Sequence, residues 1–348
     1  MMLKKTLIIF IFILICALEI SHSKENENTD NPEYTPYDVC KEKEYDLASE
    51  RCIIDTNLEP SYITAGAGIN ISAGRNGYGK WDDQIFEAEL NQHLHFFNTP
   101  KTWVWKGFMK INPKVQLRMA NVESSPVKTP GFLPRGTYFF WFKNKEKRDS
   151  FTYYSIMLSH HSNGQAGDFY TEDGRVNTDN GSFSTNFIEL ANYQYKRKYL
   201  PEWTKFSLQW HPGFNREDGL EEQYEELKIG ISIRTTKKSL GSLWPKAAEW
   251  ASASDWNFKL FSSISYVLAG RDYIIAPNDG FPQIKPVKAD WYDNINVSLN
   301  LCVKPSIFKD MYLFIKYDFG YDYYNINFQH EFNRIQFGVA GDPFGILN

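Results

Sequence analysis

The sequence lacks a long hydrophobic run after its first residues, has few cysteines, and has no excess of charge of one sign. A membrane-spanning helix needs about 20 consecutive apolar residues, and no segment after the amino-terminal run provides them. The net charge of −4 is close to balanced, so nothing in the composition indicates a nucleic-acid partner. Spanning helices after the amino-terminal run are therefore excluded, and charge alone assigns no binding partner.

The amino-terminus has the pattern of a secretory signal peptide. Lys4 and Lys5 precede an apolar run over residues 7–18, and the small residues Ser21 and Ser23 flank the end of the segment. We predict a cleaved signal over residues 1–23. A retained anchor is the weaker alternative, because the run is short for a spanning helix. Export would place the mature chain in an oxidising compartment.

Residues 24–60 are rich in charged residues and asparagine and show no clear periodicity. They predict a polar periplasmic extension outside the main domain. Cys40 and Cys52 lie close together in this segment and could form a disulfide. Cys302 would then be single, and the alternating segment around it predicts a buried, unreactive thiol.

From Tyr62 onward, apolar and polar residues alternate with the period of two that is typical of half-exposed β-strands. The clearest example is residues 295–303, where Ile, Val and Leu alternate with Asn, Ser and Cys. About twelve such segments are predicted, near residues 61–72, 84–96, 103–119, 136–143, 151–162, 182–196, 202–211, 224–235, 255–269, 291–303, 309–320 and 332–340.

These segments predict an all-β fold, a transmembrane antiparallel β-barrel over residues 61–348. Aromatic residues make up 16% of the chain, which fits the aromatic girdles of outer-membrane barrels, and bacterial barrels have even strand numbers. The alternative is a soluble β-sandwich or lipocalin-like barrel. The repeated charged residues on the polar sides and the apolar sides of about nine to eleven residues favour the membrane barrel. The long connection over 235–254 breaks the pattern of short periplasmic turns and predicts a short amphipathic helix.

The segment His160-His161-Ser162-Asn163-Gly164 carries the main chemical signal. In a strand, residues i and i+2 share a face, so His160 and Ser162 point to the same side. An imidazole beside a hydroxyl can act as the general base for a serine nucleophile. This pair continues the apolar side of its strand, which indicates an apolar substrate reached from the lipid.

A serine–histidine pair needs a third group that holds the imidazole in the right tautomer. Asn186 is the best candidate, because it shares a parity with Ser182 and Ser184 and can neighbour His160 across the hairpin. A neutral amide suits the edge of the hydrocarbon region, where a buried carboxylate would be costly. His161 has the opposite parity and is predicted to be structural, although it would replace His160 if the register moved by one residue. Glu189 is predicted to form an interior salt bridge.

Together, the elements His160-x-Ser162-Asn163-Gly164 and Ser182-x-Ser184-x-Asn186 resemble the outer-membrane phospholipase A family. The loop over residues 123–126 and the last hairpin, residues 324–339, carry the resemblance further, and it spans about residues 61–340. The resemblance implies a twelve-stranded barrel that hydrolyses acyl esters of glycerophospholipids, depends on Ca²⁺, and is active as a homodimer with its site at the outer leaflet.

By the same resemblance, Ser162 is the nucleophile, His160 the base and Asn186 its orienting group. The implied calcium ligands are the carbonyl of Gln165, the hydroxyl of Ser182, and the partner subunit's Ser124. Two other functions remain open: a lipid A deacylase, which also uses a His-x-Ser-Asn motif, and a porin-like barrel without enzymatic activity.

Overall fold

The computed structural model describes residues 46–55, 57–65, 69–70, 84–100, 103–120, 127–142, 150–172, 174, 176–196, 201–236, 257–275, 286–305, 307–308, 311–325, 328 and 331–341. Cys40, Ser124 and most of the 235–254 connection lie outside these residues, and so does the side chain of Cys52, so the predicted disulfide and the predicted short helix are not described. Within the described residues, no helix has the length and hydropathy needed to cross a membrane.

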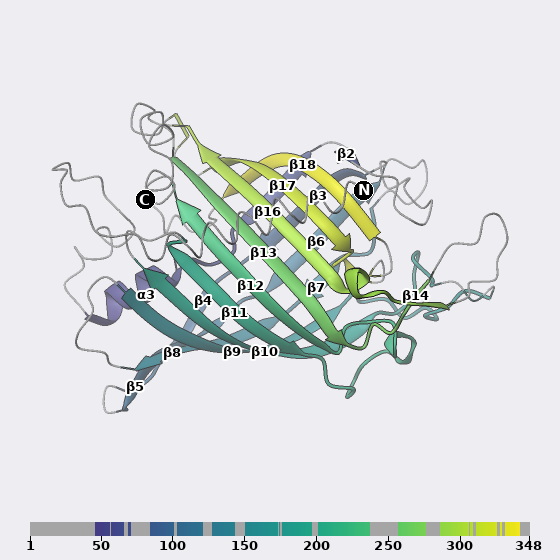
Figure 1. Cartoon of the computed structure of the whole chain (residues 1–348), viewed down its shortest axis with the longest axis horizontal. Coiled ribbons are helices and arrows are strands. Elements are labelled where there is room, and N and C mark those ends of the chain that lie inside the picture. The colour runs from purple at the N-terminus through teal and green to yellow at the C-terminus, as the bar shows by residue number, and fades with distance from the viewer. Residues whose placement is uncertain are drawn as a thin grey trace.

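In the part of the chain that the structure describes, sixteen hydrogen-bonded strands form a closed antiparallel barrel, with strands tilted across the wall (Figure 1). They are β1 (Ser61–Ala65), β2 (Ile69–Asn70), β3 (Gln84–Asn91), β4 (Leu94–Asn98), β5 (Trp105–Ile111), β6 (Lys114–Ala120), β7 (Gly131–Leu133), β8 (Arg135–Phe142), β9 (Ser150–Ser162), β10 (Ser184–Lys196), β11 (Trp203–Trp210), β12 (Leu227–Thr236), β13 (Asn257–Ala269), β16 (Ile295–Lys304), β17 (Met311–Tyr321) and β18 (Glu331–Gly341). The last strand, β18, pairs with the first, β1, which closes the wall.

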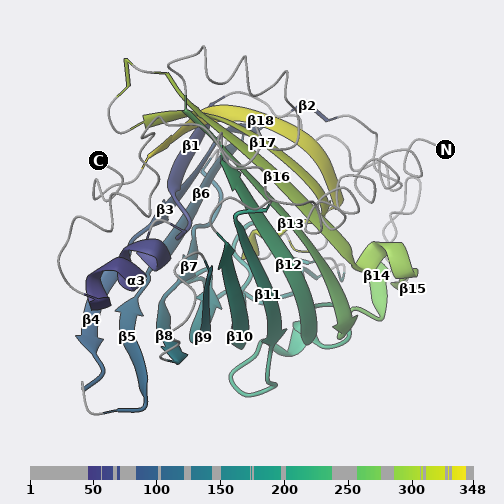
Figure 2. The same ribbon diagram turned by 60° about the vertical axis from the view of Figure 1, so that its left-hand side comes forward.

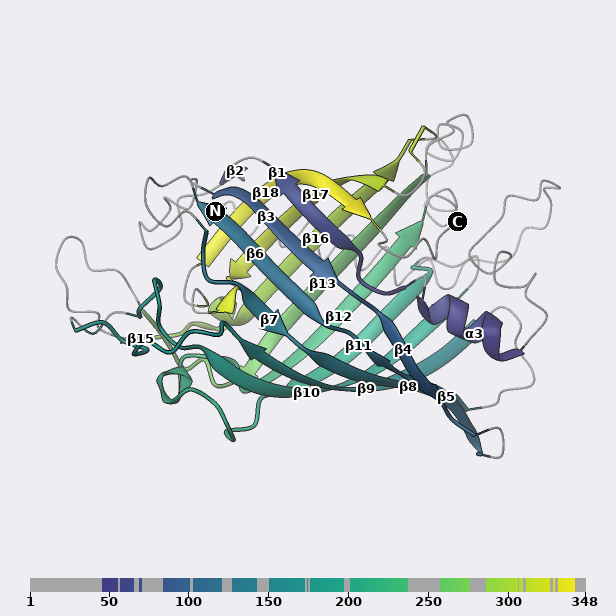
Figure 3. The same cartoon turned by 180° about the vertical axis from the view of Figure 1, so that it is seen from behind.

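Four crossings of the wall consist of two strands each: β1 with β2, β3 with β4, β5 with β6, and β7 with β8. The sixteen strands therefore make twelve crossings, and the predicted twelve-stranded antiparallel barrel is confirmed. The broken crossings lie beside one another on the side of the barrel seen in Figure 3. The longest pairing joins β9 to β10, over thirteen residue pairs from Ser184↔Ser162 to Lys196↔Ser150.

The outer surface of the barrel is apolar. Side chains along each strand alternate between this surface and the interior, as the period of two requires. On β9, for example, Ile156 and Leu158 are 42% and 58% exposed, whereas Ser155 and Ser159 are buried. A continuous outward apolar face on a closed sheet matches the lipid-facing band of an outer-membrane barrel.

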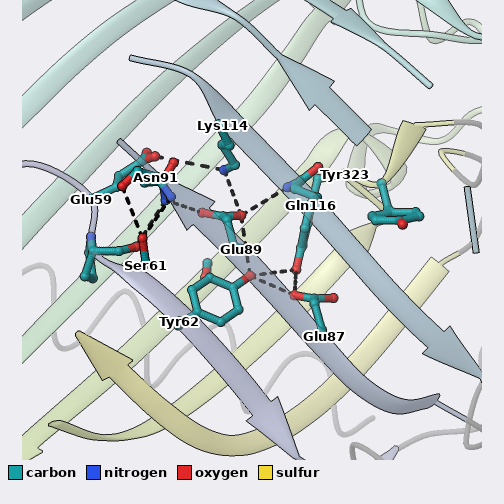
Figure 4. A network of polar contacts seen from close by, with 12 residues as sticks. Glu59, Ser61, Tyr62, Glu87, Glu89, Asn91, Lys114, Gln116 and Tyr323 are labelled. Atoms are coloured by element: carbon teal, nitrogen blue, oxygen red, sulfur yellow. Dashed lines mark hydrogen bonds and ion pairs between the residues drawn. The ribbon is translucent and has the colours of Figure 1, made fainter. Parts of the chain in front are cut away.

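The interior is polar, and its charges are paired. Glu87 is 1% exposed and accepts contacts from Arg118 Nε at 2.7 Å and Arg334 Nη2 at 3.0 Å. Tyr62 donates a hydrogen bond to Glu87 Oε1 at 2.7 Å, and Glu89 lies next to this network (Figure 4). The predicted interior salt bridge of Glu189 is confirmed, with Lys205 Nζ at 2.7 Å. Cys302 is buried, as predicted.

One end of the barrel is filled by side chains. Helix α3 (Asp46–Asp55) lies at this end (Figure 2), and its Ile53 and Ile54 are 3% and 1% exposed. They pack with inward-facing aromatic residues of five strands, namely Phe108, Phe139, Trp141, Tyr153, Tyr193, Tyr195 and Trp203. Residues 24–60 were predicted to be an extension outside the barrel domain. The described part, from residue 46, instead packs into the barrel mouth, because two adjacent apolar residues of the helix are removed from water there.

The opposite end is covered by connections between strands. Phe169 and Phe183, from the β9–β10 connection, pack with Leu220 and Tyr224 from the β11–β12 connection and with Phe328. The 3₁₀ helix η3 (Asp218–Leu220) lies in the second connection, and a small hairpin of β14 (Tyr273–Ile275) and β15 (Pro286–Lys288), followed by the 3₁₀ helix η4 (Trp291–Asn294), extends from the same end (Figure 1). The end of β9 and the start of β10 lie under these connections.

Candidate active site

His160 and Ser162 lie on the outer face of the barrel, at the end of β9. Both are partly exposed and continue the row of exposed residues formed by Ile156 and Leu158, whereas His161 is buried and faces the interior. In an extended strand the Cα atoms of residues i and i+2 are about 7 Å apart. The imidazole of His160 can therefore reach the hydroxyl of Ser162 if its ring leans along the strand. The predicted shared face is therefore present, and His161 does not replace His160 in this register.

Asn186 lies directly opposite His160 on the neighbouring strand. Its Oδ1 is 2.9 Å from His160 Nδ1, and its Nδ2 donates a hydrogen bond to the carbonyl of Phe214 at 3.0 Å. With Oδ1 as the acceptor, the proton of the neutral imidazole is held on Nδ1, and Nε2 is left as the basic nitrogen. The geometry is that required of the orienting group in a serine-hydrolase site.

Ser162 completes the group. Its cross-strand neighbours are Ser184 on β10 and Phe132 on β7. Within the described part of the chain, the hydroxyl of Ser162 makes no hydrogen bond, so its lone pairs and its proton are available to a substrate and a base. Catalytic hydrogen bonds are often longer in the free enzyme and shorten when the substrate binds.

Asn163, the next residue, organises the connection that follows. It is 1% exposed, and its Nδ2 donates to the carbonyl of Gly181 at 2.7 Å. Its Oδ1 accepts from the backbone N–H of Gln165 at 3.2 Å and of Phe183 at 3.0 Å. A single side chain thus brings the first residues of this connection next to its last ones, including Ser182.

Substitution of Asn163 by Ala is expected to lower the free energy of unfolding by about 2–3 kcal/mol, because three backbone groups lose their partner and two of them, the Gly181 carbonyl and the Phe183 N–H, are in buried hydrogen bonds. Urea titration of the barrel in detergent micelles measures the change. Asn192→Ala is the matched control, because among the described residues the Asn192 side chain accepts one long hydrogen bond, of 3.5 Å, from Gln194 and makes no other. An equal loss in both variants would show that Asn163 does not hold the connection together.

Two of the three predicted calcium ligands are brought together by this arrangement. The backbone N–H of Ser182 donates a hydrogen bond to the carbonyl of Gly167 at 2.8 Å. Ser182 therefore lies beside the segment that begins at Gln165. The exposed Asp168 is in the same connection. Among the described residues, no group of three or more His, Cys, Asp and Glu could hold a metal. The available donors are neutral oxygens, and the exposed carboxylates of Glu172 and Asp179 are in this connection as well as that of Asp168. Such a set fits a hard cation such as Ca²⁺ held with modest affinity.

A polar group lies behind the site, inside the wall. The ring nitrogens of His211 are 3.2 Å from Thr185 Oγ1 and 2.6 Å from Gln209 Nε2. Burial lowers the pKa of His211, although Glu225, 3.5 Å away, opposes the change. Burial would raise the pKa of Glu225, but Lys228, at 2.6 Å, and His211 hold it below its ordinary range. This group of paired side chains lies behind the start of β10 and contacts it through Thr185.

The surface around the site is apolar. Phe132 is 41% exposed on one side, and Trp210 and Phe214 are 50% and 64% exposed on the other. Phe132 pairs with Ser162, and the Phe214 carbonyl contacts Asn186, whereas Trp210 lies one step further along the wall, at the level of Leu158. The aliphatic row of Ile156 and Leu158 continues the apolar face away from the site. Aromatic side chains concentrate at the membrane–water interface, so the site is at the upper edge of the apolar band.

The strand pairing and the outward apolar surface define an outer-membrane type of β-barrel. Among solved structures, the chain is similar to outer membrane phospholipase A from Escherichia coli, with 12% identity, a TM-score of 0.48, and coverage of 82% of this chain and 92% of that chain. It is also similar to the Salmonella typhi outer membrane phospholipase, solved as a dimer with bound calcium, with 11% identity, a TM-score of 0.48, and coverage of 82% and 91%.

A further similar structure is the NanC porin, with 9% identity, a TM-score of 0.33, and coverage of 82% of this chain and 100% of that chain. No family model matches the chain. No curated protein matches it in sequence. These are remote likenesses of fold, to an enzyme and to a porin, and the barrel itself is established by the strand register.

Proposed function

We propose that this protein is an outer-membrane phospholipase A that hydrolyses sn-1 or sn-2 acyl esters, or both, of glycerophospholipids in the outer leaflet. The observation that supports this most is the contact of 2.9 Å between His160 Nδ1 and Asn186 Oδ1, beside Ser162, on the lipid-facing side of the wall. A water-soluble substrate would need no reactive group there. An ester at the interface, with its acyl chain in the bilayer, reaches it directly.

In the proposed reaction, His160 Nε2 takes the proton from Ser162 as the hydroxyl oxygen attacks the ester carbonyl. Asn186 stabilises the resulting imidazolium through Nδ1–H. His160 then gives its proton to the departing lysophospholipid oxygen, and an acyl group remains on Ser162. A water molecule, deprotonated by the same imidazole, hydrolyses this acyl-enzyme and releases the fatty acid.

Gln165 and Ser182 would hold a calcium ion close to Ser162, with the partner subunit's Ser124 as a further ligand in a homodimer. When bound, the ion would supply positive charge that stabilises the oxyanion. The donors are few and mostly uncharged, so the site would fill only at high calcium concentration.

Removal of calcium is expected to lower the hydrolysis of phosphatidylethanolamine by about 100-fold or more, because one source of oxyanion stabilisation is lost. Fatty-acid release in mixed micelles, with a chelator and after addition of Ca²⁺ or Mg²⁺, measures it. Full activity in the chelator would contradict the calcium role.

The same preparation distinguishes the alternative functions. Acyl release from lipid A alone would favour a deacylase, and channel conductance without hydrolysis would favour a porin.

A further inference from the structure

The backbone segment that follows β11 contacts the candidate orienting residue. The carbonyl of Phe214 accepts the hydrogen bond from Asn186 Nδ2, at 3.0 Å. A carboxamide has its oxygen and nitrogen on opposite sides, so a fixed Nδ2 turns Oδ1 toward His160. The position of the Phe214 carbonyl therefore decides whether Asn186 presents an acceptor or a donor to the imidazole.

This segment makes a turn at Asn215, whose φ of 52° is in the left-handed region that Asn adopts more readily than most residues other than glycine. The turn is joined to β10 by the N–H of Glu217, which donates to the carbonyl of Ser184 at 2.9 Å, and by a longer contact of 3.4 Å from the Ser184 hydroxyl to the carbonyl of Asn215. These two contacts hold Asn215 and Glu217 beside Ser184, and neither of them involves the Phe214 carbonyl itself.

Arg216 provides the remaining support. Its side chain is 7% exposed, and Nη2 donates to the carbonyls of Leu220 at 2.7 Å and Tyr224 at 3.1 Å. Leu220 and Tyr224 belong to the buried cluster that covers this end of the barrel. One planar guanidinium thus connects the turn to the packed part of the connection.

We infer that Arg216 is a positioning residue for ester hydrolysis. It holds the turn so that the Phe214 carbonyl keeps the oxygen of Asn186 directed at His160. This inference rests on the proposed function. Within the described residues Arg216 contacts neither His160 nor Ser162, so a positioning role requires that its effect on kcat depend on Asn186.

A double-mutant cycle tests this, with Arg216→Met and Asn186→Ala made singly and together in the full chain. Release of fatty acid from phosphatidylethanolamine in calcium-containing micelles gives kcat and KM. We expect Arg216→Met to lower kcat about tenfold with KM changed less than about twofold, and to change kcat less than about twofold when Asn186 is already Ala. The same loss of kcat in both backgrounds would overturn the inference. An inactive wild-type enzyme would overturn the proposed function as well.

Two further variants separate positioning from a general loosening of the connections. Arg271→Met is matched, because Arg271 is also buried at this end, donates to the carbonyl of Asp293 at 3.1 Å and lies 4.6 Å from the Tyr321 ring centre. It is expected to leave kcat within about twofold of the wild type. Arg216→Lys keeps the charge but loses the fork of donors, and should give an intermediate loss that also disappears with Asn186→Ala. Equal losses of kcat in Arg271→Met and Arg216→Met would contradict the positioning role. This comparison applies even if Arg216→Met does not fold fully.

Discussion

Replacement of Ser162 by alanine is expected to lower phospholipid hydrolysis by about 10⁴-fold or more, since removal of a nucleophile abolishes the covalent route. The hydroxyl makes no contact that the fold depends on within the described residues, so the variant should unfold at the same urea concentration as the wild type. Fatty-acid release from phosphatidylethanolamine, measured with calcium present, gives the rate. The assay uses the same micelles for both proteins.

Ser159→Ala is the matched control for this variant. Ser159 is on the same strand, three residues earlier, but it faces the interior, where its hydroxyl donates to the carbonyl of Pro134 at 3.3 Å. The control should retain activity within about twofold of the wild type. If Ser162→Ala still hydrolysed phospholipid at the wild-type rate, another residue would be the nucleophile. The proposed role of His160 as the base for Ser162 would then be wrong as well.

The second large effect concerns stability. Substitution of Glu87 by Ala is expected to lower the free energy of unfolding by about 3–5 kcal/mol, because the buried Arg118, Arg334 and Lys316 lose their shared counter-ion. Urea unfolding in detergent micelles measures the loss, and the heat-dependent shift of barrels in gel electrophoresis gives an independent reading.

Glu59→Ala tests whether the loss of stability expected for Glu87→Ala comes from the burial of the charges. The Glu59 side chain is 60% exposed and reaches Arg135 Nη1 at 3.3 Å and Lys114 Nζ at 3.9 Å. Water reaches this carboxylate, so its loss should cost much less stability than the loss of the buried Glu87. Equal losses for Glu59 and Glu87 would contradict the view that the interior network stabilises the barrel by compensating buried charge.

Much of the wall could be predicted from the sequence, because each strand has one side in lipid and one side in a polar interior. The alternation over 295–303 gives β16 (Ile295–Lys304) to within one residue. The position of helix α3 in the mouth of the barrel could not be predicted. Its contact with the barrel depends on two consecutive isoleucines and on aromatic residues from five separate strands, which no local pattern connects. The breaks within four crossings likewise depend on neighbouring strands.

The candidate site was predictable where side chains follow the strand period. The parity of His160, Ser162 and Asn186 places them on one face, and the register brings His160 opposite Asn186. Their catalytic roles, and the metal-binding roles of Gln165 and Ser182, stay predictions. The supports of the site were not predicted. The carbonyl of Phe214 is a backbone group that carries no sequence signal. Asn163 belongs to the motif, but the motif does not show which backbone groups its side chain binds.

The outward position of His160 and Ser162 has a kinetic consequence. A reactive group on the wall of a barrel meets its substrate by lateral diffusion in two dimensions, so the rate should follow the mole fraction of ester in the surface and not its bulk concentration. Dilution of the substrate with inert detergent, at constant total ester, would then slow turnover. The same placement makes the physical state of the surrounding lipid, its packing and its fluidity, part of the rate law.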